Sequence, residues 1–167
     1  NPLYIIIIFY LMENLNKLYK DLTHQDPHFR QNAVISLGRY FSDTKARESL
    51  TPDEKSNIVS QLLTRLEPKE DSIEVKGRTV KVFSQIACFL SESEIIQLFT
   101  KIIKYLTNKN SEGKDIYVTC IKTIFTQAPG SLCYMIGKVI IPELITGINS
   151  NNDEIVSLCL STFSDYI

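Results

Sequence analysis

The 167-residue sequence contains no tryptophan, only two histidines and no excess of either charge. Its net charge of −1 argues against a general binder of nucleic acid or of membrane surfaces, because such proteins carry a basic excess. The four cysteines form no CxxC pair and no regular framework. In a chain of this size that pattern indicates buried thiols in a reducing compartment, and so we expect a soluble intracellular protein.

Motifs for chemistry are missing as well, because no GxGxxG or GK[S/T] loop is present to bind phosphate groups. His24 and His28 lie four residues apart with Asp26 between them, but Pro27 interrupts the trio and no further metal ligand lies nearby. We interpret them as turn residues, with Asp26 or Gln25 capping the next helix. We therefore expect no enzyme, and no metal, cofactor or small-molecule substrate.

Two groups of reactive side chains have plain structural interpretations. Cysteines in apolar segments are expected to serve packing: Cys88, Cys120 and Cys159. Carboxylates clustered in one turn are expected to be solvated: Glu67, Glu70, Asp71 and Glu74.

The run from Leu3 to Met12 is the most hydrophobic stretch of the chain. It is about half as long as the roughly 20 apolar residues that span a bilayer, and it lacks the flanking features of a secretory signal. We expect residues 1–11 to be an apolar extension that packs on another surface, because an exposed run of this kind is prone to strand pairing. We expect no later segment to be long or apolar enough to cross a membrane.

The dominant pattern is a repeat. Four segments, aligned on their first apolar residue, carry apolar or small residues at i, i+4, i+5 and i+8, which is one face of an α-helix. Their alignment positions are Phe29, Val75, Ile116 and Ile155. The i+4 residue is small in every copy: Ala33, Thr79, Cys120 and Cys159.

A second helical pattern and a polar turn precede each of these segments, and the unit recurs about every 40–47 residues, the period of HEAT repeats. We therefore predict an all-α fold, an α-solenoid of about four HEAT-type helix pairs over residues 12–167. The predicted pairs cover about 12–41, 52–90, 92–128 and 131–167.

Local signals agree with these helices. Thr51 and Ser91, each followed three residues later by a glutamate (Glu54 and Glu94), predict capping boxes, and Pro142 predicts a kinked or restarted helix. The last pair would leave an apolar flank facing solvent. Since a solenoid needs a polar cap at a natural end, we expect the chain to be the front piece of a longer array.

The second helices also suggest a binding surface. We expect positions one, three and six after the alignment residue to point away from the core or along its edge, so that stacked helices form one ridge. Its basic and aromatic residues are the candidate protein-binding site: Arg30, Lys76, Arg78, Lys81, Tyr117 and Lys122. Such a ridge suits an acidic or mixed protein surface, although an ordinary solvated face is the alternative.

Two stretches carry a family resemblance: KDIYVTCIKTIFTQAP at 114–129, and MENLNKLYKDLTHQDPHFRQNAV from Met12, with an Asp-x-x-Phe-Arg turn at Asp26, Phe29 and Arg30. They resemble the cullin-associated, neddylation-dissociated proteins, the TATA-binding-protein-interacting HEAT family. The resemblance runs from Met12 to the end of the chain and corresponds to the first few of that family's many repeats. It implies that residues 1–11 precede the natural start.

The resemblance further implies a scaffold that sequesters unmodified cullin–RING ubiquitin ligases and promotes exchange of their substrate receptors. The implied partner is the cullin C-terminal region with its RING subunit, and the implied location is cytoplasmic and nuclear. No nucleic acid and no membrane are expected as partners.

Other proteins with HEAT repeats remain alternatives. Nuclear transport receptors and phosphatase scaffolds would share every packing feature. A HEAT-like DNA glycosylase is an enzymatic alternative, but that fold uses a basic, aromatic-rich concave face, whereas this chain has no tryptophan and a net charge of −1. DNA affinity that falls steeply with salt would favour it.

Overall fold

The computed structural model describes residues 13–127 and 129–166, and the predicted apolar extension 1–11 lies outside them. The described residues contain helices and no strand. The helices are residues 13–21, α2 Pro27–Ser42, α3 Thr44–Ser49, α4 Pro52–Thr64, α5 Ile73–Ile86, the 3-10 helix η1 Ala87–Phe89, α6 Glu92–Thr107, α7 Asp115–Gln127, α8 Gly130–Ile148 and α9 Asp153–Tyr166. The prediction of an all-α solenoid of helix pairs is confirmed.

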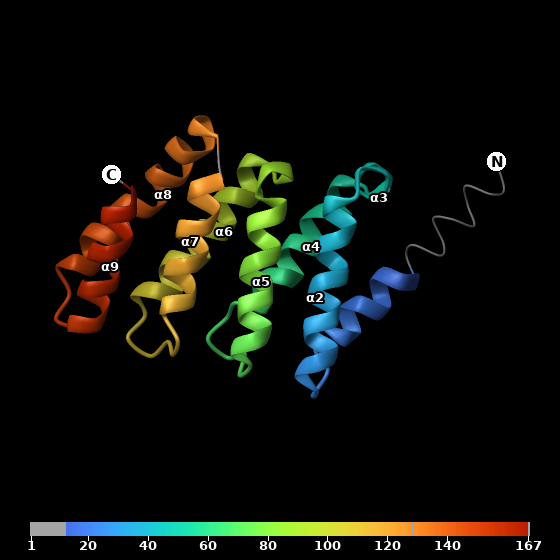
Figure 1. Cartoon of the computed structure of the whole chain (residues 1–167), viewed down its shortest axis with the longest axis horizontal. Helices are drawn as coiled ribbons and strands as arrows, with labels where there is room; N and C mark the ends of the chain where they lie inside the picture. The colour runs from blue at the N-terminus through green and yellow to red at the C-terminus, as the bar shows by residue number, and fades with distance from the viewer. Residues whose placement is uncertain (1–12, 128, 167) are drawn as a thin grey trace.

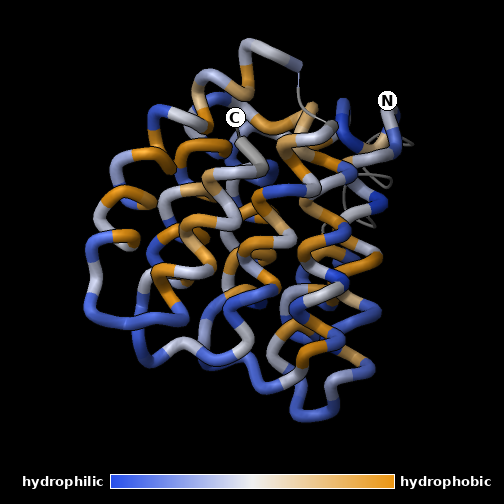
Figure 2. Tube along the Cα trace, turned by 60° about the vertical axis from the view of Figure 1, so that its left-hand side comes forward, coloured by the Kyte–Doolittle hydropathy of each residue, from blue (hydrophilic) through white to orange (hydrophobic). Residues whose placement is uncertain are grey.

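The helices stack in two layers (Figure 1). The second helices of the pairs, α2, α5, α7 and α9, lie side by side in one layer, and each contacts the next. The other layer contains α4, α6 and α8. The turns within pairs gather at the lower edge of the view, where Figure 2 shows them as hydrophilic. Neighbouring pairs therefore meet along their helices and also at these turns.

Side-chain caps set where the helices begin. The capping boxes predicted for α4 and α6 are both formed: Thr51 with Glu54, and Ser91 with Glu94. Of the two predicted caps, Asp26 is the one that caps α2, by accepting a 2.9 Å hydrogen bond from a first-turn backbone N–H. Each cap stabilises its helix by about 1 kcal/mol, so local sequence alone defines these starts.

The small residues predicted at i+4 are all buried: Ala33, Thr79, Cys120 and Cys159. Burial raises the pKa of Cys120 to about 12, so its thiol is not a nucleophilic thiolate at neutral pH. Cys88 is exposed, and the prediction that it packs in the core is wrong. It lies in η1, where the chain has already left α5.

Helix α8 corrects a second expectation. By length and composition it could cross a membrane, because it contains just two charged residues, Lys138 and Glu143. In the structure it packs against α6 and α9, and 28% of its apolar window is buried. Pro142 lies inside α8, which continues to Ile148 without a restart.

Glycines bring adjacent helices close together at two places. A Cβ atom added to Gly38 of α2 would lie 2.9 Å from both methyl carbons of Val82 in α5. A Cβ atom on Gly147 of α8 would overlap the Sγ atom of Cys159 in α9. These contacts leave no room for a methyl group and therefore set the helix spacing.

We expect Gly147→Ala to lower the free energy of unfolding by about 1–3 kcal/mol, because the added methyl group overpacks the α8–α9 contact. Urea denaturation would measure it. The matched control is Gly77→Ala in α5, where nothing lies within 4 Å of the new Cβ and the helix should gain about 0.5–1 kcal/mol.

The steric cause can be isolated by adding Cys159→Ala. The double variant should be less destabilised than the sum of the two single variants, because each change relieves the other. Additive effects would contradict an α8–α9 clash.

Candidate functional site

The structure divides the six predicted binding residues into two groups. Arg30, Lys76 and Tyr117, all at position one, are only 6%, 4% and 0% exposed. The prediction that position one lies on an exposed ridge is wrong. Position one precedes the buried i+5 position by four residues, so the two positions lie on the same face of the helix.

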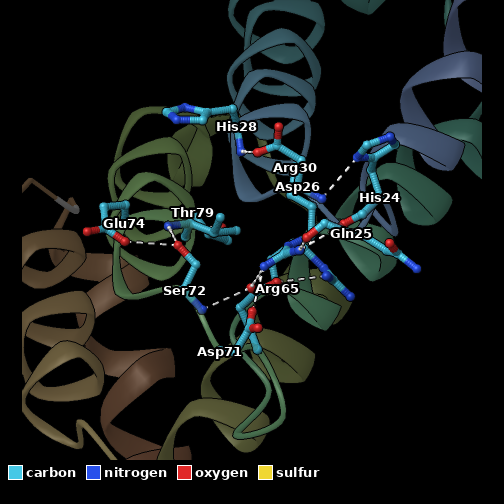
Figure 3. Close-up of polar contacts among 12 residues, drawn as sticks. His24, Gln25, Asp26, His28, Arg30, Arg65, Asp71, Ser72, Glu74 and Thr79 are labelled. Carbon is cyan, nitrogen blue, oxygen red and sulfur yellow. Dashed lines mark hydrogen bonds and ion pairs between the residues drawn. The ribbon is translucent and has the colours of Figure 1, made fainter.

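Arg30 is held in a network of charges between the first two turns (Figure 3). Its Nη1 donates to the two carbonyl oxygens of residues 24–25, both at 2.8 Å. Its Nη2 donates to Glu70 at 2.8 Å and to Asp71 at 2.6 Å. Arg65 pairs with the second oxygen of Glu70 at 2.7 Å. The network thus connects the turn before α2 to the turn before α5.

This network corrects the expectation of a solvated carboxylate cluster. The Glu70 side chain is 1% exposed, whereas that of Asp71 is 86% exposed. Asp71 and the exposed Glu74 are solvated as predicted, but Glu70 is a buried partner of two guanidinium groups.

The other turns are linked in a similar way. The hydroxyl of Tyr117 donates to the carbonyl oxygen of Leu66 at 2.7 Å, and burial raises the pKa of Tyr117 to about 12. Lys114 pairs at 3.0 Å with Glu154, which lies in the first helical turn of α9. Burial lowers the pKa of Lys76. We call the three cross-links Arg30–Glu70, Tyr117–Leu66 and Lys114–Glu154 the turn ladder, and its residues serve the fold.

The second group of predicted residues is exposed: Arg78, Lys81 and Lys122. Arg78 and Lys81 line a groove of about 640 Å³ between α2 and α5 together with Arg39, which the sequence analysis missed. Arg39 lies at position ten, one helical turn beyond position six, so following the same helix face further would have found it. Lys122 lies on α7 and is not part of the groove lining.

Two facing stripes form this groove, because α2 and α5 run side by side in the same direction (Figure 1). The α2 stripe is Ile35, Gly38, Arg39 and Ser42, and the α5 stripe is Arg78, Lys81, Val82 and Gln85. Each stripe spans eight residues, or roughly 10 Å along its helix from the first residue to the last. The close contact at Gly38 and Val82 fixes their register.

The charge of the groove is uncompensated. Its lining contains no aspartate or glutamate. Within the described part of the chain, the side chains of Arg39, Arg78 and Lys81 form no ion pair or hydrogen bond. Three like charges in one hollow attract anions, and guanidinium groups can bind them through paired N–H donors. No cluster of potential metal ligands occurs among the described residues.

Comparisons with known proteins identify the fold. No family model matches the sequence, and no curated protein matches it. An engineered protein of known structure is 19% identical with a TM-score of 0.51, over 91% of this chain and 62% of that one. A designed armadillo repeat protein in complex with the peptide (KR)4 is 17% identical with a TM-score of 0.51, over 92% of this chain and 64% of that one.

The chain therefore spans less than two thirds of the length of either protein. At these identities the likeness concerns the fold alone. The chain is a helical repeat protein of the solenoid type.

We expect Arg30→Met to lower the free energy of unfolding by about 3 kcal/mol, because it removes one partner of a buried ion pair. Urea denaturation at neutral pH would measure this. The control is Lys69→Ala, since the Lys69–Glu67 pair is exposed at its lysine and should contribute less than about 1 kcal/mol. Equal losses in the two variants would show that the buried network has no special role.

Proposed function

We propose that this chain is a non-enzymatic protein-interaction scaffold whose layer of second helices binds an acidic segment of a partner protein. The groove between α2 and α5 is the observation that carries the proposal. It presents Arg39, Arg78 and Lys81 without a carboxylate in its lining, beside the partly exposed Ile35 and the mostly buried Val82. Such a surface attracts an acidic chain electrostatically, while the apolar residues provide contact area.

A neighbour of the same fold supports a peptide-binding role. The designed armadillo repeat protein is in complex with the peptide (KR)4, which is basic. The groove described above is itself basic, so its charge favours a partner of the opposite sign.

Residues 114–129 and the opening segment resemble the cullin-associated, neddylation-dissociated proteins. The partner that we propose is therefore the C-terminal region of a cullin with its RING subunit. In this proposal the scaffold acts in the cytoplasm and nucleus and regulates cullin–RING ubiquitin ligases. The partner's identity rests on that resemblance, whereas its acidic character rests on the groove.

We expect the immobilised 167-residue chain to capture an unmodified cullin–RING pair at physiological salt. The variant Arg39→Glu, Arg78→Glu, Lys81→Glu should weaken capture by at least about tenfold, because like charges would then face the acidic segment. Lys76 is left unchanged because it is buried, and its replacement would disturb folding.

The matched control reverses three exposed lysines outside the groove: Lys45→Glu, Lys104→Glu and Lys109→Glu. It has the same net charge as the groove variant and should retain capture. Equal capture by both variants would remove the groove from the function. Equal loss would indicate a general charge effect, and no capture by the unmodified chain would overturn the cullin assignment.

A further inference from the structure

We infer that the α2–α5 groove recognises a phosphorylated serine or threonine within the acidic segment. This inference rests on the proposed function and specifies what the groove selects. Its basis is the convergence of two arginines and one lysine on a single hollow that contains no carboxylate.

The number and type of cations favour a phosphate over a carboxylate. A phosphoryl group carries about −1.5 to −2 charges at neutral pH and has three acceptor oxygens, whereas an aspartate or glutamate side chain carries one charge. Arg39 and Arg78 each offer a planar fork of N–H donors that matches phosphate oxygens. Lys81 adds a third charge from the same lining.

The neutral groups of the groove are consistent with this assignment. The hydroxyl of Ser42 donates to the carbonyl oxygen of Gly38 at 3.0 Å. Its proton is therefore already engaged, and the proposed phosphate contacts do not include it. Gln85 offers amide donors at the end of the α5 stripe. The groove, at about 640 Å³, has room for a phosphorylated side chain and its flanking backbone, with Ile35 and Val82 beside them.

The distribution of charge argues against nucleic acid as the ligand. Binding to a nucleic acid requires several successive phosphate contacts along a basic track. Here the basic cluster is short, since α7 contributes only Lys122 to this layer. Helix α9 begins with Asp153 and Glu154 and contains no lysine or arginine. One local cluster of cations suits one phosphate group.

The test compares three peptides, acetyl-Gly-Glu-Glu-X-Glu-Glu-Gly-amide, in which X is phosphoserine, glutamate or serine. Isothermal titration of the 167-residue chain should show the phosphoserine peptide binding at least about tenfold more tightly than the glutamate peptide. Equal affinities would overturn the phosphate inference and leave the proposed function standing. No binding of any peptide would overturn both. Tighter binding of a single-stranded thymidine 12-mer would assign the groove to nucleic acid instead.

A charge-conserving variant separates the guanidinium forks from charge alone. Arg39→Lys, Arg78→Lys should bind the glutamate peptide within about twofold of the unmodified chain and lose most of the preference for phosphoserine, because lysine lacks the fork. The control Lys104→Arg, outside the groove, should retain the full preference. A phosphoserine preference that survives in the double lysine variant would overturn the inference.

Discussion

The buried ion pair between Arg30 and Glu70 is the constraint on which the first half of this solenoid depends. In a repeat array each unit contacts only its neighbours, so the placement of one pair against the next is decided at a single interface. At that interface, the ion pair of Arg30 with Glu70 joins the turn before α2 to the turn before α5. The contact of Gly38 with Val82 sets the spacing of α2 and α5 further along the helices. Buried ion pairs add little net stability but tolerate little displacement, because breaking one leaves a buried charge without a partner. The ladder therefore holds the register, and apolar packing supplies most of the stabilisation.

Much of this architecture could be predicted from the sequence, because it depends on periodicity and local caps. The helix starts at Thr51 and Ser91 follow from side chains within one turn of the backbone. The buried i+4 residues follow from a spacing that holds in every copy. These features need no knowledge of which distant segments meet.

The candidate binding site was harder to predict, because the burial and pairing of a charged side chain depend on its tertiary neighbours. Arg30 looks like a surface residue until Glu70, forty positions away, is placed beside it. The same contact buries Glu70, which its turn composition had marked as solvated. Composition likewise marks α8 as apolar enough to cross a membrane, but its hydropathy does not reveal that it packs on α6 and α9. Arg39 was not predicted because the exposed positions of the second helices were considered only up to position six, and Arg39 lies one helical turn further on.

The groove and the core share Gly38 and Val82, but the charged side chains of the groove lie outside the core. Gly38 sits in the close α2–α5 contact and also borders the groove, so changing it would alter helix spacing and groove shape together. The charged ends of Arg39, Arg78 and Lys81 have no structural partner among the described residues. Their charges can therefore be changed with little effect on folding, unlike those of Arg30 and Lys76. A solenoid can in this way keep its stacking while the exposed positions of the same helices determine which partner it binds.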